Sequence, residues 1–303
     1  MTVNDTYKIF ILRHGQSELN HENIFCGWID ATLTEEGKIQ ARNAATLIKK
    51  FCHTKESLPK IAFGSRLIRT HQTLEVMLDE LGLKGDYEIV TKSTNLNDIL
   101  EAHKEGKIPV LQSWRLNERH YGSWQGQRKP DVLKEYGKEQ YMFIRRDYWG
   151  KPPPADLERE MIQEKHDKGA LTGYDFKEPT RHIKYALEEK SGETLPNSES
   201  LSDVVRRLNV FLDQIIVGSL DKCSSSLVVA HGSTVRSMLK ILEGISDDDI
   251  KDINIPNAIP IVVELDKATK KFVRRYYLDP ELAEQNAERV RNEGFENQSQ
   301  DRN

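Results

Sequence analysis

The sequence has little cysteine, no long hydrophobic run and almost no excess charge. Three cysteines occur among 303 residues without a CxxC pair, which favours neither a disulfide framework nor a zinc ribbon. No run approaches the ~20 apolar residues of a membrane-spanning helix. The net charge of −4 argues against non-specific nucleic-acid binding. We therefore expect a soluble cytoplasmic protein with reduced thiols, and neither a membrane nor a nucleic-acid partner.

Common cofactor motifs are also missing. Neither GxxxxGK[ST] nor GxGxxG occurs, so nucleotide binding has no motif to support it. His21-Glu22 lacks the second histidine of an HExxH zinc motif. We accordingly predict no metal site.

Strand-like and helical segments alternate along the chain. Apolar, β-rich runs predict strands at 7–12, 60–64, 110–116, 227–230, 261–265 and 272–277. Helical spacing predicts helices at 33–51, with Thr34 as N-cap, at 69–81 and at 204–216, the last followed by a turn-like stretch at 219–226. Such alternation indicates an α/β three-layer sandwich, a mostly parallel central sheet with helices on both faces.

Two long connections and the end of the chain depart from this rhythm. The connections at 82–112 and 155–194 exceed ordinary loop lengths, and such insertions are usually functional or mobile. Residues 281–303 are polar and free of lysine, which predicts a short helix followed by a mobile tail. We therefore expect one domain at 1–280, enlarged by the two insertions, and a C-terminal tail.

The chemistry gathers where two predicted strands each end in His-Gly. His14-Gly15 follows the first strand, and His231-Gly232 follows the strand 227–230. Ligands of open parallel sheets bind at the carboxyl ends of the strands, so neighbouring strands would bring both imidazoles to one crevice. Glycine after each histidine lets the chain turn sharply and brings a ligand close to the backbone.

Charged residues near these turns suggest a phosphate pocket. Arg13 precedes His14, and Arg69 begins the helix after the next strand; arginine forks match phosphate oxygens. A neutral imidazole can accept a phosphoryl group, and a protonated second histidine would stabilise the charge that develops during transfer. Departure of an alkoxide still needs a proton donor, for which Glu118 is the candidate.

Longer segments make the chain resemble a known family. They include LRHGQSELNHENIFCGWIDATLTEEGK, SRLIRTHQT, SWRLNERHYG, RRDYWGKPPP and VAHGSTVRSMLKILEGIS. The chain is similar to the cofactor-dependent phosphoglycerate mutases of the histidine phosphatase superfamily, and in particular to the divergent minor members of that family in budding yeasts. RHGQSE indicates only the superfamily, whereas SWRLNERHYG with the later Arg-Arg pair and LEGIS indicates the mutase branch.

The resemblance implies interconversion of 3-phosphoglycerate and 2-phosphoglycerate, in glycolysis and gluconeogenesis, by an enzyme primed with 2,3-bisphosphoglycerate and often dimeric or tetrameric. It implies that His14 carries the phosphoryl group, that Glu118 exchanges the proton, and that Arg13, Arg69 and His231 complete the phosphate pocket. It also implies a substrate lining made of Gly15, Gln16, Ser17, Glu18, Leu19, Asn20, Cys26, Gly27, Arg119, His120, Tyr121, Lys129, Arg145, Arg146, Gly232 and Ser233.

The basic residues among these have a physical reason. Moving a phosphate between two hydroxyls of one glycerate needs a second anion site, for the carboxylate and for the other end of the bisphosphate. Lys129, Arg145 and Arg146 supply that charge, although a solvated basic loop is the simpler interpretation without the resemblance.

Several positions depart from the family pattern. Ser233 stands where asparagine is usual beside the second histidine, Asn257-Ala258 replaces Thr-Gly, Leu19 replaces tryptophan, and Ile68 replaces serine. Such changes can slow turnover, since misplacing a group by ~1 Å can cost ~100-fold in rate. Two alternatives therefore stay open: a phosphohistidine-type phosphatase that releases the phosphoryl group to water, and a weakly active or non-functional mutase paralogue.

Overall fold

In the computed structural model, residues 6–83, 87–90, 100, 107–158, 178 and 180–295 are described. They form one seven-stranded sheet with the strand order β3-β4-β2-β5-β1-β6-β7. The first five strands in this order pair in parallel, and β6 and β7 extend the β1 edge antiparallel. The strands are β1 Thr6–Arg13, β2 Ala62–Gly64, β3 Tyr87–Val90, β4 Ile108–Gln112, β5 Ser225–Ala230, β6 Ile261–Asp266 and β7 Phe272–Tyr277.

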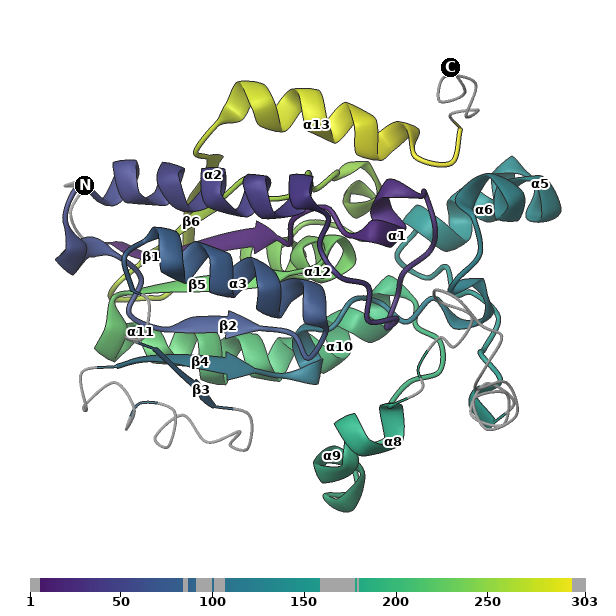
Figure 1. Cartoon of the computed structure of the whole chain (residues 1–303), viewed down its shortest axis with the longest axis horizontal. Helices are drawn as coiled ribbons and strands as arrows, with labels where there is room; N and C mark the ends of the chain where they lie inside the picture. The colour runs from purple at the N-terminus through teal and green to yellow at the C-terminus, as the bar shows by residue number, and fades with distance from the viewer. Residues whose placement is uncertain are drawn as a thin grey trace.

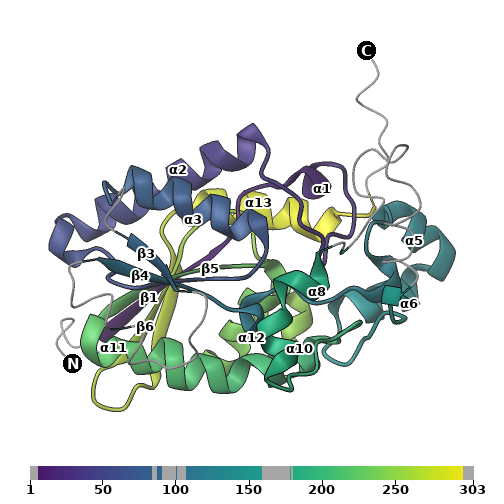
Figure 2. The same ribbon diagram turned by 60° about the horizontal axis from the view of Figure 1, so that its bottom comes forward.

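Helices cover both faces of this sheet, as Figures 1 and 2 show. One face carries α2 Glu35–Cys52, α3 Ile68–Glu80 and α13 Pro280–Asn292. The opposite face carries α10 Leu201–Phe211, the π-helical turn η4 Leu212–Val217, α11 Gly218–Cys223 and α12 Gly232–Glu243. The predicted three-layer α/β sandwich with a mostly parallel sheet is confirmed.

The strand β1 shows how the sequence builds two cores. Successive side chains of a strand point to opposite faces of the sheet. Ile9 and Ile11 join the cluster under α10–α12, and Phe10 and Leu12 join the cluster under α2 and α3. All four are 0–1% exposed, and burying each contributes about 1.5–3 kcal/mol. This two-sided burial is why the strand reads as an unbroken apolar run.

Short helices beyond the carboxyl ends of the parallel strands form a separate region (Figure 1). α5 and α6 lie farthest from the sheet, and α8 and α9 project below them. The set comprises α1 Glu18–His21, η2 Trp114–Leu116, η3 Gly122–Trp124, α5 Lys129–Tyr136, α6 Lys138–Arg146, α8 Arg181–Lys184, α9 Ala186–Lys190 and η5 Asp249–Asp252; η1 Lys55–Ser57 follows α2 elsewhere.

Most predicted elements form within one or two residues of the expected bounds, and Thr34 caps α2 by accepting from the Gly37 amide. The strand expected at 110–116 is wrong in its second half, because the Ser113 hydroxyl accepts from the Arg115 amide and starts the 3-10 turn η2. The turn expected at 219–226 is also wrong. The helical path continues to Cys223, and only Ser224, with φ 59°, ends it.

The two insertions and the tail are described in part. The first insertion contains β3 and β4; its residues 84–86, 91–99 and 101–106 lie outside the described residues. The second contains α8 and α9; its residues 159–177 and 179 lie outside. The end of the chain forms α13, and the expected mobility of 296–303 also falls outside. The single-domain division stays a prediction. None of the described helices is long and apolar enough to cross a membrane.

Two glycines fix the loop after β1 against the first turn of α2. A Cβ on Gly15 would lie 2.2 Å from the Gly37 carbonyl oxygen, and a Cβ on Gly37 would lie 2.1 Å from the Gln16 carbonyl oxygen. Both contacts are backbone to backbone, so no side-chain rotation relieves them. The close approach holds the residues that follow His14 in place.

We predict that Gly37→Ala destabilises the fold by about 2 kcal/mol, because the overpacked contact outweighs the gain in helix propensity. Chemical denaturation measures the loss. Asn43→Ala, an exposed change in the same helix, is the control and should stay within about 0.5 kcal/mol of the wild type. Equal stability of the two variants would contradict the tight approach.

Candidate active site

The two histidines meet at the carboxyl ends of β1 and β5. These strands pair with Arg13 opposite Ala230, so His14 and His231 leave the sheet side by side. The His14 amide donates to the Ala230 carbonyl at 3.0 Å, and the two imidazole centroids lie 5.0 Å apart at 62°. The predicted meeting of the two His-Gly turns in one crevice is confirmed.

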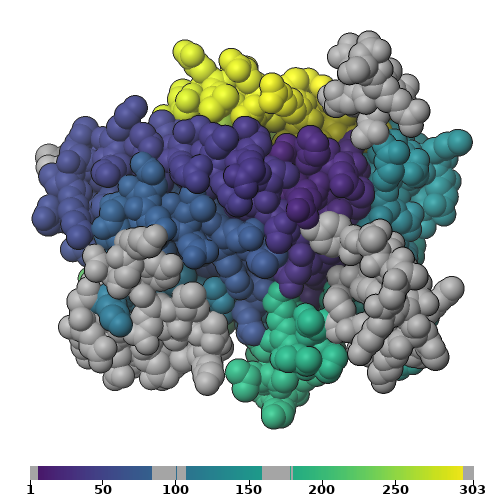
Figure 3. Space-filling model, in the orientation of Figure 1, coloured from purple at the N-terminus to yellow at the C-terminus, as the bar shows by residue number. Residues whose placement is uncertain are grey.

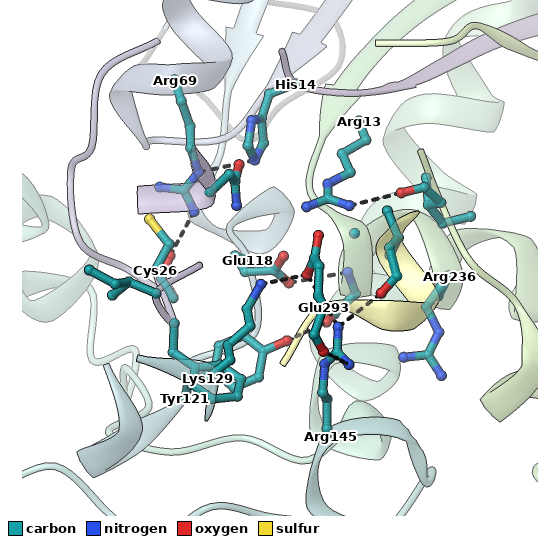
Figure 4. A pocket seen from close by; sticks show the side chains of 18 of the residues that line it. Arg13, His14, Cys26, Arg69, Glu118, Tyr121, Lys129, Arg145, Arg236 and Glu293 are labelled. Carbon is teal, nitrogen blue, oxygen red and sulfur yellow. Dashed lines mark hydrogen bonds and ion pairs between the residues drawn. The ribbon is translucent and has the colours of Figure 1, made fainter. Parts of the chain in front are cut away.

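Two hydrogen bonds fix the tautomer of His14. Its Nδ1 lies 2.6 Å from the Gly15 carbonyl oxygen, which is only an acceptor, so Nδ1 carries the hydrogen. The Arg69 Nε–H donates to Nε2 at 3.1 Å, and a guanidinium is only a donor, so Nε2 carries the lone pair. The nitrogen with the free lone pair, Nε2, therefore faces Arg69 and the pocket (Figure 4).

Both imidazoles are neutral in this environment. Burial, assisted by the charges of Arg69 and Arg13, holds the pKa of His14 well below its ordinary value. Burial and the charge of Arg69 likewise hold the pKa of His231 well below its ordinary value. The second histidine bonds Ser65 Oγ through Nε2 at 2.8 Å, whereas its buried Nδ1 has no hydrogen-bond partner among the described residues. A neutral His14 suits nucleophilic attack.

A strongly cationic pocket opens in front of His14 (Figure 4). Its lining contains six basic side chains and two carboxylates. The basic side chains are Arg13, Arg69, Lys129, Arg145, Arg146 and Arg236, and the carboxylates are Glu118 and Glu293; His14, Asn20, Ile24, Phe25, Cys26, Gly27, Tyr121, Gly232, Ser233, Ile255 and Val290 complete it. This balance favours an anionic ligand with more than one charge.

Backbone carbonyls hold the guanidinium groups nearest His14. Arg69 donates to the carbonyls of Gly27 at 2.7 Å and Ile29 at 2.8 Å, and Arg13 donates to that of Ile255 at 2.9 Å. Neutral carbonyls satisfy the donors without cancelling the charge. In the part of the chain that the structure describes, the buried Nε of Arg13 has no hydrogen-bond partner, which leaves a donor for a ligand beside Gly232.

Glu118 is held by two amides. Its Oε1 accepts from the backbone N–H of Arg119 at 2.7 Å and of Ser233 at 3.2 Å. Ser233, one of the departures from the family pattern, thus holds Glu118 through its backbone amide. Its hydroxyl lies 3.4 Å from Tyr121 Oη. Glu118 reaches the pocket from the loop after η2.

A second group of cations lies across the pocket. Lys129 Nζ lies 2.5 Å from Glu293 Oε2, and an Arg145 guanidinium nitrogen donates to the same oxygen at 3.2 Å. Arg146 donates to the carbonyls of Lys251 and Ile253, and burial beside Arg145 lowers the pKa of Arg146 to about 10. All three cations predicted for a second anion site are therefore in the pocket wall.

The predicted lining residues just after His14 build the loop rather than the pocket surface. Ser17 caps α1, Gln16 accepts from the Thr34 hydroxyl, and Leu19 is buried with Cys26 in an apolar cluster. Of this segment, only Asn20 lines the pocket beside His14; Gly15, Gln16, Ser17, Glu18 and Leu19 do not.

Arg119 and His120 also lie behind the lining. The Arg119 guanidinium donates to the carbonyls of Ile144, Gly150 and Arg145 and lies 4.5 Å from the Tyr121 ring centroid. His120 Nε2 lies 2.5 Å from Glu178 Oε1, within the described part of the second insertion. Their roles as substrate ligands stay predictions.

Asn257-Ala258 supports the backbone at Arg13 and His14. Asn257 Nδ2 donates to the His14 carbonyl at 2.8 Å, and the Ala258 amide donates to the Arg13 carbonyl at 2.9 Å. Ala258 adopts φ 50°, a conformation that favours glycine, so the departure from Thr-Gly places strain behind His14.

Sequence reasoning missed two charged lining residues. Arg236 follows Ser233 at i+3 on α12, and that spacing could have placed it on the same helix face. Burial, then the charge of Arg146, holds the pKa of Arg236 well below its ordinary value. Glu293 lies just beyond α13 in a polar segment, where no sequence pattern distinguishes it from neighbouring acids.

Comparison with known proteins identifies the family. The model of the histidine phosphatase superfamily (branch 1) matches residues 9–99 and 165–277. Phosphoglycerate mutase 3 of Saccharomyces cerevisiae (strain ATCC 204508 / S288c) is 63% identical over 300 residues, covering 98% of this chain and 99% of the relative. Phosphoglycerate mutase 2 of the same yeast is 60% identical over 97% of each chain. The chain therefore belongs to the histidine phosphatase superfamily, and within it to the phosphoglycerate mutases.

More distant relatives agree. The 2,3-bisphosphoglycerate-dependent phosphoglycerate mutase of Arthrobacter sp. (strain FB24) is 37% identical and covers 95% of this chain and 99% of its own. Among solved structures, the mycobacterial glucosyl-3-phosphoglycerate phosphatase aligns with TM-score 0.56 and 17% identity, covering 90% of this chain and 98% of its own. At that identity the second likeness shows the fold alone.

No cluster of three or more histidine, cysteine or carboxylate side chains that could hold a metal ion occurs among the described residues.

Cys26 donates to the Ile29 carbonyl, and burial raises the pKa of its thiol.

We predict that stability falls as the pH drops below about 6.5, the ordinary pKa of histidine. Below this pH the unfolded chain binds protons at these two histidines, whereas native His14 and His231 stay neutral because their pKa values are lowered. Proton binding therefore stabilises the unfolded state relative to the native state. His14→Gln should lower the slope of unfolding free energy between pH 5 and 6 by about 1 kcal/mol per pH unit. At pH 8 the histidine is neutral in both the native and the unfolded state, so the change in unfolding free energy caused by His14→Gln at that pH measures only the loss of packing. An unchanged slope would show that native His14 titrates normally.

Proposed function

We propose that this chain is a phosphoglycerate mutase that interconverts 3-phosphoglycerate and 2-phosphoglycerate through a phosphohistidine at His14. The observation that carries the proposal is the pocket's pairing of a neutral nucleophile with cations at both ends. Arg13 and Arg69 flank His14, and Lys129 with Arg145 stands across from them. Relatives at 60–63% identity are named phosphoglycerate mutases, which supports the same reaction.

The transfer uses groups whose positions suit it. In the primed state His14 Nε2 carries the phosphoryl group, and the free hydroxyl oxygen of the substrate attacks its phosphorus while the bond from Nε2 to phosphorus breaks. Nε2 then attacks the other phosphorus of the resulting bisphosphate, and the bond from that phosphorus to the glycerate oxygen breaks. Arg69 and Arg13 stabilise the charge on the phosphoryl oxygens. His231 Nδ1, for which the described residues offer no partner, would donate to one of these oxygens once protonated. Glu118 takes the proton of the attacking hydroxyl in the first transfer and gives it to the departing alkoxide in the second.

The pocket fits the primer 2,3-bisphosphoglycerate. This bisphosphate has anionic groups at both ends, and the six basic side chains of the lining suit that charge. Arg13 and Arg69 would hold one phosphate, and Lys129, Arg145 and Arg146 would hold the other end. When bound, the primer supplies the phosphoryl group that loads His14. The proposal involves no metal.

Three further features belong to this proposal. A glycolytic and gluconeogenic mutase works where its phosphorylated glycerate substrates are, so we propose a cytoplasmic location. We also propose a homo-oligomer, a dimer or tetramer, because the family often forms one. Neither nucleic acid nor membrane is a partner in this function.

We expect purified protein to form 2-phosphoglycerate from 3-phosphoglycerate when 2,3-bisphosphoglycerate is present. Following 2-phosphoglycerate and free phosphate separately tests this. His14→Ala should lower the rate on the order of 10³-fold or more, because the covalent route is lost. No isomer above that control would refute the proposal. Free phosphate without isomer would select the phosphatase, and neither product with binding retained would select the inactive paralogue.

Glu118→Gln should lower kcat by roughly 10²–10⁴-fold, the usual contribution of a general acid. Its amide oxygen can still accept from the amides of Arg119 and Ser233, so the geometry is kept. KM should not rise, because removing a negative charge from the pocket does not weaken the binding of an anionic substrate. Steady-state kinetics measure both, with Glu139→Gln on the exposed face of α6 as control. A normal kcat would remove Glu118 from proton transfer.

A further inference from the structure

The C-terminal segment carries a carboxylate into the pocket (Figure 4). α13 ends at Asn292, and the next side chain, Glu293, points between Lys129 and Arg145. Its Oε2 lies 2.5 Å from Lys129 Nζ and 3.2 Å from an Arg145 guanidinium nitrogen. Arg145 also donates to the backbone carbonyls of Glu293 at 2.9 Å and Val290 at 3.1 Å. The segment thus uses the donors of the second cation group.

This carboxylate is an anion throughout the physiological range. Burial opposes its ionisation, but Lys129, Arg13 and Arg145 outweigh burial and lower the pKa of Glu293 to about 2. Glu293 is one of only two carboxylates in the described lining, against six basic side chains. It stands where an anionic ligand facing these cations would stand.

The segment that carries Glu293 is held lightly. α13 forms the outer surface above α2 in the space-filling view, and Ala283 is its one buried residue (Figure 3). Beyond the helix, Phe295 contacts Tyr141 edge-on at 6.3 Å and is still 41% exposed. Few apolar contacts hold the segment, so its polar contacts with Lys129 and Arg145 are the main ones that have to break when it leaves.

We propose that Glu293 is an internal competitor for the anion subsite made by Lys129 and Arg145, so that a ligand's second anionic group binds only when the C-terminal segment moves out. The identity of the ligand rests on the proposed function, whereas the competition rests on the contacts of Glu293. A single phosphate near His14 leaves Glu293 in place, whereas a ligand with two anionic ends has to displace it. Glu293 thereby weakens the binding of ligands with two anionic ends relative to that of a single phosphate.

Competition follows from the donors that are shared. The Lys129 ammonium and the Arg145 guanidinium already contact Glu293, and a second anion at the same donors would lie within a few ångströms of its carboxylate. Like charges that close repel, and a pocket of low dielectric strengthens the repulsion. The ligand and Glu293 therefore exclude each other at this subsite.

The first test measures binding of 2,3-bisphosphoglycerate by calorimetry to the wild type and to Glu293→Gln. The variant keeps the shape of the side chain and removes its charge. If the segment occupies the subsite about 90% of the time, the dissociation constant falls about tenfold in the variant. Glu288→Gln is the matched control, since Glu288 lies on the same helix and pairs with exposed Arg291. Equal or weaker binding by Glu293→Gln would overturn the proposal.

The second test uses the unchanged protein, so it does not depend on how well a variant folds. The Glu293 amide donates to the Arg289 carbonyl, and the Phe295 amide donates to that of Asn292. Hydrogen exchange of residues 290–295 should speed up when 2,3-bisphosphoglycerate is added, because the segment leaves. Inorganic phosphate should change it much less. Unchanged or slower exchange with the bisphosphate would show a segment that stays and closes over the ligand, which overturns the proposal.

These outcomes are separate from those of the turnover assay. Faster exchange and tighter binding by Glu293→Gln, without formation of 2-phosphoglycerate, would refute the mutase function and leave the competition standing. Turnover of 3-phosphoglycerate with no effect of Glu293→Gln on binding would support the mutase function and refute the competition. Failure of both proteins to bind the bisphosphate would overturn the competition as well.

Discussion

The parallel register between β1 and β5 is the constraint on which the site depends. Because Arg13 pairs with Ala230, the next residue of each strand leaves the sheet at the same level, and both residues are histidines. A shift by one residue would turn the core side chains of β1 to the wrong faces, so burial of Ile9, Phe10, Ile11 and Leu12 fixes the register. Core packing thereby sets the 5.0 Å separation of the imidazoles.

A second constraint is the burial of positive charge around this pair. Charged groups are costly to bury unless hydrogen bonds satisfy them. Here carbonyl oxygens do most of this, as for Arg69 with Gly27 and Ile29, and for Arg236 with Arg146 and Ile250. Backbone dipoles satisfy the donors but leave the net charge, so the pocket keeps a positive potential. This potential adds to burial in lowering the pKa of His14 and favours anionic ligands. The same arrangement thus supports both of the roles that we propose for the site, His14 as nucleophile and the cations as the anion-binding residues.

The sequence could predict whatever depends on local pattern. Apolar runs located the strands, Thr34 was recognisable as a cap, and the His-Gly turns placed His14 and His231 together. Lys129, Arg145 and Arg146 could be assigned to the pocket only through resemblance, because they come from α5 and α6, outside the sheet. Arg119 shows the limit of that assignment: it is fully buried and bonded to carbonyls behind the lining.

What the sequence could not predict is the contact between Glu293 and Lys129. Glu293 meets Lys129 across 164 positions, and its helix shows the same acids and arginines as any solvated helix. Only the tertiary path of α13, along the sheet face that also carries α2 and α3, brings Glu293 to the pocket. The described pocket lining has six basic side chains and two carboxylates, so a further negative charge from a ligand or from the chain itself is favoured there. In this protein the chain supplies part of it, so the end of the sequence belongs to the binding equilibrium as much as the motifs do.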